Sequence, residues 1–185
     1  MPEPRSLDDL LALDRHGAPL TYLYFWGHAP LPSGEIGPPC LSQWWASAFT
    51  VGEVTYRTAE HWMMAQKARM FGDEDAVAKI VAAQSPKAAK ALGREVRGFD
   101  QQTWVARRFE IVTEGSMAKF GQNPALKDYL LSTGEQVLVE ASPLDRIWGI
   151  GMTADDDRAQ RPSQWDGLNL LGFALMEARA TARLP

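Results

Sequence analysis

The stretch TAEHWMMAQK, residues 58–67, decides where the helical part of the fold begins. Thr58 is a favourable N-cap residue, and the sequence after it predicts a helix that runs to about Met70. Glu60 then lies in the first turn, where the helix dipole stabilises a carboxylate in any protein. Lys67 lies two turns further along the same face, with two methionines between. This mixed face predicts either the wall of a pocket or an ordinary amphipathic helix with polar decoration.

Further helices are indicated by capping residues and by glycine or proline at their ends. Thus Ser6 caps a short helix near the start of the chain, and Asp166 opens a last helix near its end. Between them the same signals predict four helices, over residues 73–83, 86–93, 101–120 and 124–133.

The strands are expected to be few and short. Residues 19–27 are rich in aromatic side chains, and residues 136–142 alternate and are β-branched, so both segments predict strands. Two more short strands are expected around Val51-Gly52-Glu53, and residues 144–152 indicate a strand edge that runs into a loop. Proline and glycine at 28–40 and polar residues at 152–165 predict loops. The expected fold is one α+β domain, mainly α-helical, with a small β-sheet built from both ends of the chain.

Composition narrows the class of protein. The chain has 185 residues, enough for one domain with a proper core, and a net charge of −4 that argues against gripping long nucleic acids by bulk charge. Cys40 is the single cysteine, so no intramolecular disulfide forms. We expect a cytoplasmic protein without a membrane span or signal peptide. Seven tryptophans fill the core or offer flat faces to a planar ligand.

Three other places are candidates for chemistry. His61 adjoins Glu60 but points about 100° away on a helix, so a hydrogen-bonded partner is the simpler interpretation than a catalytic dyad. Asp145 precedes Trp148-Gly149, where glycine lets the backbone approach a ligand, although a β-turn with a solvated aspartate fits as well. Trp104 is followed one turn later by two arginines, which suits a stacking face or a core tryptophan equally.

Metal and cofactor chemistry finds little support. The sequence contains no glycine-rich phosphate loop, and three histidines and one cysteine show no recognised zinc spacing. The run Asp155-Asp156-Asp157 lacks the alternating spacing of a calcium loop and favours a solvated loop. We therefore expect neither a metal nor a cofactor.

Five separated motifs, in order, resemble the NADAR family, also called YbiA-like. The stretch TAEHWMMAQKARMF resembles the family signature [ST]-E-H-[YF]-[FM]-x-A-Q-K, and the resemblance extends over roughly residues 20 to 180. In the motif LSQWWASAF, which precedes this signature in the chain, Gln43 stands where the family has asparagine, and Trp44-Trp45 follow. The motifs are TAEHWMMAQKARMF (58–71), LSQWWASAF (41–49), WVARRFEIVTEGSMAKF (104–120), LLSTGEQVLVEASPLDRIWGIG (130–151) and NLLGFALMEAR (169–179).

The resemblance implies a YbiA-like α+β fold over residues 20–185, preceded by an extension at 1–19, and an N-glycosidase activity. Members are similar to enzymes that cleave the bond between ribose 5-phosphate and an aminopyrimidine in early riboflavin synthesis. It implies catalytic roles for Glu60, Lys67 and Asp145, and a base held between Trp104 and Trp148. Substrate-binding roles are implied for Trp104, Trp148, Gly149, His61, Gln43, Trp45 and Asn169.

Alternatives stay open at this point. Other family members remove ADP-ribose from guanine bases, so an ADP-ribosylated guanine in nucleic acid is a second substrate class. A module that binds a nucleotide-like ligand without catalysis is a third. Glu60 or Asp145 is expected to handle the proton, and Lys67 to attack a ribose aldehyde or to hold a phosphate. The sequence does not give the oligomeric state.

Overall fold

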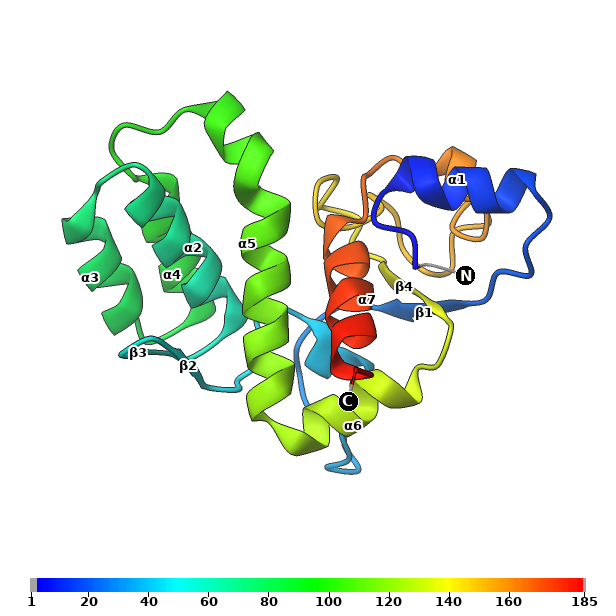
Figure 1. Cartoon of the computed structure of the whole chain (residues 1–185), viewed down its shortest axis with the longest axis horizontal. Helices are drawn as coiled ribbons and strands as arrows, with labels where there is room; N and C mark the ends of the chain where they lie inside the picture. Colours follow the sequence, from blue (N-terminus) through cyan, green and yellow to red (C-terminus); the bar gives the residue numbers. More distant parts are fainter. Residues whose placement is uncertain (1–2, 185) are drawn as a thin grey trace.

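Helix α5 (Gln101–Gln122) runs through the middle of the molecule and separates two groups of elements (Figure 1). The computed structural model describes residues 3–184. On one side lie α2 (Ala59–Met70), α3 (Glu74–Ala82) and α4 (Pro86–Arg94). The opposite side holds α7 (Leu170–Ala182), which packs along α5. The remaining helices are α1 (Leu7–Arg15), α6 (Pro124–Ser132) and the short 3-10 helices η1 (Pro38–Leu41) and η2 (Pro162–Gln164).

Four of the predicted helix starts are confirmed, and each rests on a side chain that satisfies a free N–H group. Thr58 caps α2, Asp73 caps α3, Ser85 caps α4 and Asp100 caps α5, each accepting a hydrogen bond from a backbone N–H in the first turn. Only the ends shift: α5 runs past the glycine at 121 to Gln122, a difference of two residues.

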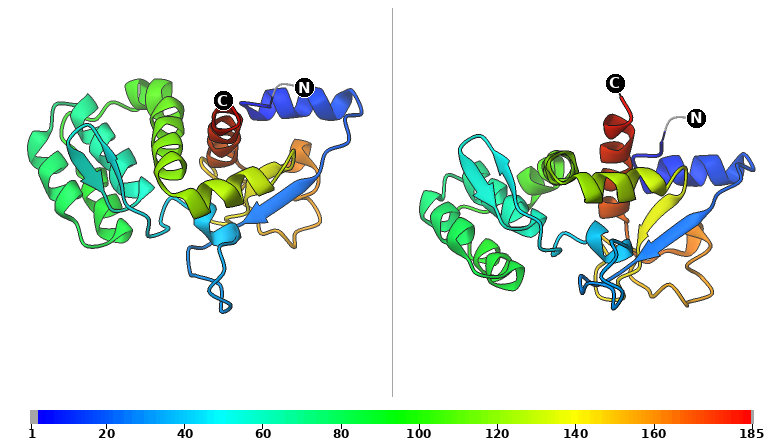
Figure 2. Two further views of the ribbon diagram at one scale, coloured as in Figure 1. Left: turned by 60° about the horizontal axis from the view of Figure 1, so that its bottom comes forward. Right: turned by 90° about the horizontal axis from the view of Figure 1, so that it is seen from below.

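The strands form two separate pairs rather than one sheet. Strand β1 (Tyr22–Phe25) pairs in parallel with β4 (Val137–Glu140), which joins the two ends of the chain as predicted. Strands β2 (Phe49–Val51) and β3 (Val54–Tyr56) form an antiparallel hairpin that packs against α5 and α2. Both pairs are two-stranded, so the mainly helical α+β class is confirmed. Figure 2 shows the β1–β4 pair on the far side of α5 from the hairpin.

Residues 144–152 do not form the predicted strand edge. The Asp145 carboxylate accepts hydrogen bonds from the backbone N–H groups of Ile147 and Trp148, at 2.9 and 2.7 Å, and so closes a turn. This turn then pairs with residues 166–171 through their backbone groups. Because those N–H groups are already bound, the last helix begins at Leu170 rather than at Asp166.

The loop that precedes this pairing is held against the core. Trp165 and Tyr24 both donate side-chain hydrogen bonds to the carbonyl of Ala159, which is fully buried. Of the predicted solvated aspartates, Asp156 pairs with Arg158 at 2.8 Å. The predicted loop at 152–165 is confirmed apart from the short helix η2, and two aromatic side chains attach it to the core.

The N-terminal segment, predicted as an extension, packs against the C-terminal helix. Leu10 of α1 is fully buried, and Glu3 forms a salt bridge at 2.7 Å with Arg179 of α7, which is 1% exposed. Between residues 3 and 184 no helix combines the length and the apolar character needed to cross a membrane.

Candidate active site

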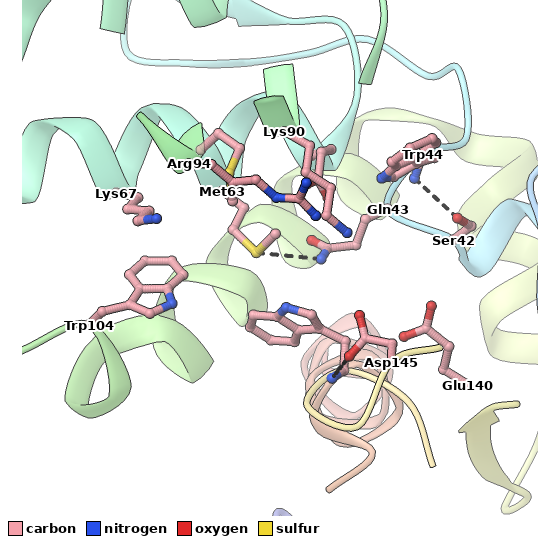
Figure 3. A pocket seen from close by; sticks show the side chains of 13 residues that line it. Ser42, Gln43, Trp44, Met63, Lys67, Lys90, Arg94, Trp104, Glu140 and Asp145 are labelled. Carbon is pink, nitrogen blue, oxygen red and sulfur yellow. Dashed lines mark hydrogen bonds between the residues drawn. The ribbon is translucent and has the colours of Figure 1, made fainter. Parts of the chain in front are cut away.

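A cavity of about 170 Å³, here called the inner cavity, lies where the two groups of elements meet (Figure 3). Its wall comes from α2, α4, α5, the end of β4, the turn after β4, and the segment that follows η1. The residues that line it are Ser42, Gln43, Trp44, Glu60, Met63, Met64, Lys67, Lys90, Arg94, Trp104, Glu140, Asp145 and Trp148.

Close packing fixes the helix that carries the opening motif. Trp62 of α2 donates from its indole nitrogen to the carbonyl of Ile111 in α5, at 2.7 Å. A Cβ atom at Gly115 would lie 2.3 Å from this indole, so only glycine lets the two helices approach so closely. Trp62 thus turns the opposite face of α2, with Glu60 and Lys67, toward the cavity. This mixed face does line a pocket, as the pattern had suggested.

One end of the inner cavity is acidic. Glu60 is 3% exposed, and its Oε1 atom has no hydrogen-bond partner among the described residues. Burial raises the pKa of Glu60 to about 7, although the nearby Lys90 ammonium opposes the shift. Stabilisation of the helix dipole by an acid in the first turn does not account for a carboxylate that is buried in this way.

Glu140 is a second carboxylate at this end, and sequence reasoning did not select it. It lies at the end of β4, and its buried Oε2 atom also lacks a partner within the described chain. Burial raises the pKa of Glu140 to about 8, and the neighbouring Asp145 and Glu60 add to the effect. Figure 3 shows the side chains of Glu140 and Asp145 close together.

The other end of the cavity is basic. Lys67 donates a hydrogen bond to the carbonyl of Gly93 at 2.7 Å, and its ammonium lies 4.2 Å from the centre of the Phe99 ring. Burial and the neighbouring Arg94 lower the pKa of Lys67. Within residues 3–184, neither Lys67, Lys90 nor Arg94 forms an ion pair with a carboxylate. Three such cations around a cavity suit an anion such as phosphate.

A buried lysine positions the segment between η1 and β2. The Lys119 ammonium donates to the carbonyls of Cys40 and Ser42, at 2.6 and 2.8 Å. Gln43 follows, and its amide nitrogen lies 3.5 Å from the sulfur of Met63 on α2. In this way α5 holds the segment that forms the roof of the inner cavity.

The structure brings six of the ten predicted site residues to the cavity and leaves four outside its wall. His61 is fully buried, and its ring nitrogens lie 2.8 Å from the Thr58 hydroxyl and 3.1 Å from the carbonyl of Ala83. Trp45 is half-buried against the core. A role for these two in direct contact with a ligand in the cavity has no support from their position. The six lining residues are Glu60, Lys67, Asp145, Trp104, Trp148 and Gln43.

Gly149 and Asn169 act instead on the acidic end. Asn169 donates to the carbonyl of Leu138 at 2.9 Å and accepts from the backbone N–H of Glu140 at 3.0 Å. A Cβ at Gly149 would lie 2.7 Å from the Glu140 carbonyl. Both residues therefore position the end of β4, and with it the Glu140 side chain, rather than lining the cavity.

Sequence signals for the missed residues were present but weak. Lys90 and Arg94 are spaced i, i+4 on α4 and so share a face. Glu140 follows three buried apolar residues of a strand, where a charged side chain is unusual. Among residues 3–184, no three His, Cys, Asp or Glu side chains gather in a way that could hold a metal ion.

Comparison with known proteins adds a family to this geometry. The model of the NADAR domain matches residues 24–183. N-glycosidase R617 of Acanthamoeba polyphaga mimivirus is 42% identical over 163 residues, which cover 85% of this chain and 94% of that protein. N-glycosidase YbiA of Escherichia coli (strain K12) is 32% identical over 125 residues, covering 68% of this chain and 69% of that protein.

Two further similarities are to a solved structure and to a longer protein. The solution structure of E. coli YbiA superposes with a TM-score of 0.68 and 28% identity, over 87% of this chain and 84% of that one. Riboflavin biosynthesis protein PYRR of Zea mays is 34% identical over 133 residues, or 68% of this chain and 20% of that protein. The fold and the site therefore define an enzyme of the N-glycosyl hydrolase class. The chain belongs to the NADAR family.

Proposed function

We propose that this enzyme hydrolyses the C–N bond between ribose 5-phosphate and an aminopyrimidine base, with early intermediates of riboflavin synthesis as its substrates. The observation that carries the proposal is the division of charge in the inner cavity. Unpartnered carboxylate oxygens lie at one end, where Lys90 also lies, and the cations Lys67 and Arg94, without ion pairs among the described residues, lie toward the other. A sugar phosphate matches both ends, with its phosphate at the cations and its anomeric carbon at the acids.

The acidic end suits cleavage of a glycosidic bond. As the C1–N bond breaks, its electron pair moves to the base and positive charge develops on the sugar, which a nearby carboxylate stabilises. Glu140, whose raised pKa keeps it protonated at neutral pH, gives its proton to the leaving nitrogen. Water then adds to C1, and Glu60 or Asp145 takes the proton that this water releases.

Lys67 has two possible roles at the other end. Seven residues separate it from Glu60, which places their Cα atoms roughly 10 Å apart along the helix axis. This separation lets Lys67 hold the 5-phosphate together with Arg94. Alternatively, the ribosylamine ring opens to an imine between C1 and the base nitrogen. A lysine with a lowered pKa adds to C1 and displaces the base amine, and water then hydrolyses the resulting Schiff base to the free sugar phosphate.

A direct test measures ribose 5-phosphate released from a ribosylaminopyrimidine phosphate, with ADP-ribosylated DNA assayed in parallel. Release from the first substrate alone is expected, since the unpaired cations lie within a cavity rather than over an open face. Release only from the DNA would overturn the assignment of substrate. PYRR, named for riboflavin biosynthesis, supports the choice of the first substrate.

Two variants and one trapping experiment test the roles of the residues. Glu60→Gln is expected to lower turnover by roughly 10²–10⁴-fold without unfolding the protein. The matched control is Glu74→Gln, on the exposed first turn of α3, with unchanged turnover. Near-normal turnover of Glu60→Gln would remove this residue from the mechanism. Borohydride added with substrate labels Lys67 if the Schiff base forms, and the absence of an adduct leaves the phosphate-binding role.

A further inference from the structure

A second depression adjoins the inner cavity and opens to solvent. This outer groove has a volume of about 440 Å³. Trp26, His28 and Leu144 line it without reaching the inner cavity, and Leu144 lies just before Asp145 in the turn after β4. Five residues line both spaces, so the outer groove is continuous with the acidic end of the inner cavity: Ser42, Trp44, Lys90, Glu140 and Asp145.

The inner cavity is small for a whole substrate. Sites for small molecules usually have volumes of about 300–1,000 Å³. At about 170 Å³ the inner cavity falls well below this range, whereas the outer groove lies within it. A phosphorylated ribose joined to a base must therefore extend from one space into the other.

The lining of the outer groove suits a planar ring. Trp26 is 57% exposed and Leu144 is 90% exposed, both high values for large apolar side chains. The rings of His28 and Trp44 lie 5.4 Å apart between centroids, and the Lys90 ammonium lies 5.8 Å from the centre of the Trp44 ring. Exposed flat faces are what a heteroaromatic base needs for stacking.

The position of the carboxylates fixes the direction of the substrate. Glu140 and Asp145 line both spaces, whereas Lys67 and Arg94 line only the inner cavity. In Figure 3, Lys67 and Trp104 lie at the side away from Glu140, Asp145 and Trp44. A phosphate drawn toward Lys67 and Arg94 places the other end of the sugar at the junction of the two spaces.

We infer that the outer groove is the subsite for the leaving base, a planar aminopyrimidine, and that the scissile bond crosses the junction beside Glu140. Trp104 and Trp148 then face the sugar phosphate, in place of the base that the sequence motifs had put between them. The inference rests on the proposed function, because it takes the cleaved bond to join a sugar phosphate to a base. It assigns base selectivity to Trp26, Trp44 and Leu144.

Separate binding of the two products tests this division. Binding of a free aminopyrimidine and of ribose 5-phosphate is measured by calorimetry for the wild type and for Trp26→Ala, Leu144→Ser and the double variant. Loss of one stacking face is expected to weaken aminopyrimidine binding by roughly 10-fold. Binding of ribose 5-phosphate is expected to stay within about twofold, since neither residue lines the inner cavity. The control is Leu184→Ser, 71% exposed near the C-terminus, which should change neither affinity.

Two outcomes overturn the inference. The first is an aminopyrimidine affinity that is absent in the wild type or unchanged in the double variant. The second is a loss of ribose 5-phosphate affinity equal to that for the base. Failure of the proposed function is a different result, namely a wild type that binds both compounds but releases no sugar from their conjugate. Because Trp26 and Leu144 are exposed, the variants at these positions are expected to unfold at the same thermal midpoint as the wild type.

Discussion

Buried charges are handled in opposite ways at the two sides of this molecule. At the junction of α7 with the N-terminal segment, the Arg179 guanidinium is 1% exposed and fully engaged. It donates to both carboxylate oxygens of Glu3, to the Thr133 hydroxyl and to the carbonyl of Gln136. In the inner cavity, Glu60 and Glu140 each keep a buried oxygen without a partner among residues 3–184.

The difference separates a structural site from a reactive one. A buried charge that loses its partner destabilises a protein strongly, so the Arg179 cluster contributes to stability only while it is complete. A buried oxygen without a partner costs free energy in the folded state. Such a cost is expected where function requires groups that are desolvated before the ligand arrives. Each of the following variants changes one side of this comparison.

The largest effect is expected for Glu140→Gln. The amide keeps the size of the side chain but cannot give a proton to the leaving base, so turnover should fall by roughly 10²–10⁴-fold. The thermal midpoint should stay the same or rise, because a buried carboxyl group has been replaced by a neutral amide. Turnover and thermal unfolding are measured on the same preparation. A lowered midpoint with retained turnover would make Glu140 a structural residue and would remove the contrast.

Arg179→Met is expected to lower stability and to leave the active site intact, the reverse of Glu140→Gln. Removing the guanidinium leaves Glu3, 13% exposed, with only the weaker contact to Arg183, and leaves Thr133 without its donor. The free energy of unfolding should fall by about 3–5 kcal/mol, as when one member of a buried ion pair is removed. Urea unfolding measures this loss. At a temperature where the variant is folded, its affinity for ribose 5-phosphate should match the wild type, and a selective loss of affinity would link this cluster to the site.

These two regions also mark how far sequence reasoning reached. The helix starts at Thr58, Asp73, Ser85 and Asp100 were predictable because each depends on one side chain and its nearest backbone groups. For α2, helical spacing left a pocket wall and an ordinary amphipathic helix equally open, and the structure places Glu60 and Lys67 in a pocket wall. The motifs that resemble the NADAR family then connected these local signals to one site.

The features that local sequence patterns did not predict depend on contacts between distant segments of the chain. The turn at 144–152 and the late start of α7 arise because residues 166–171 bond to residues 146–150, which no local pattern specifies. Glu140 gains its character from burial beside Glu60, a neighbour that is eighty positions away in the sequence. Likewise, the amide of Asn169 is bound to the backbone of β4, a contact that no local pattern specifies.

The pH dependence of stability provides a distinct test. The folded pKa values of Glu60 and Glu140 are about 7 and about 8, above the ordinary value of 4.5, so the folded state binds more protons between these limits. Their contribution to stability is therefore full below pH 4.5 and is lost as pH rises to about 8. Relative to a Glu60→Gln, Glu140→Gln double variant, the wild type should lose several kcal/mol over this range, since each pH unit by which a folded pKa exceeds the ordinary value corresponds to about 1.4 kcal/mol.

The difference between the stability curves of the wild type and the double variant cancels the contributions of other titrating groups. Burial lowers the pKa of His61, which makes stability rise with pH below its ordinary value of 6.5, but this histidine is present in both. Chemical unfolding at half-unit steps from pH 4.5 to 8.5 gives the two curves. Parallel curves would mean that the two carboxyl groups titrate as they do in the unfolded chain, and the unpartnered oxygens would then carry no special role.

The smallest effect is expected for Arg5→Ala, which tests whether burial decides the strength of the N-terminal junction. Arg5 also joins the N-terminal segment to α7, through a salt bridge of 2.8 Å to Glu177, but its side chain is 63% exposed. Exposed ion pairs contribute about 0.2–1 kcal/mol, and salt screens them. The expected loss on urea unfolding is therefore below about 1 kcal/mol and should shrink in 1 M NaCl, unlike that of Arg179→Met. Equal losses for Arg5 and Arg179 would show that attachment of the N-terminal segment, rather than the burial of one guanidinium, sets the stability of this junction.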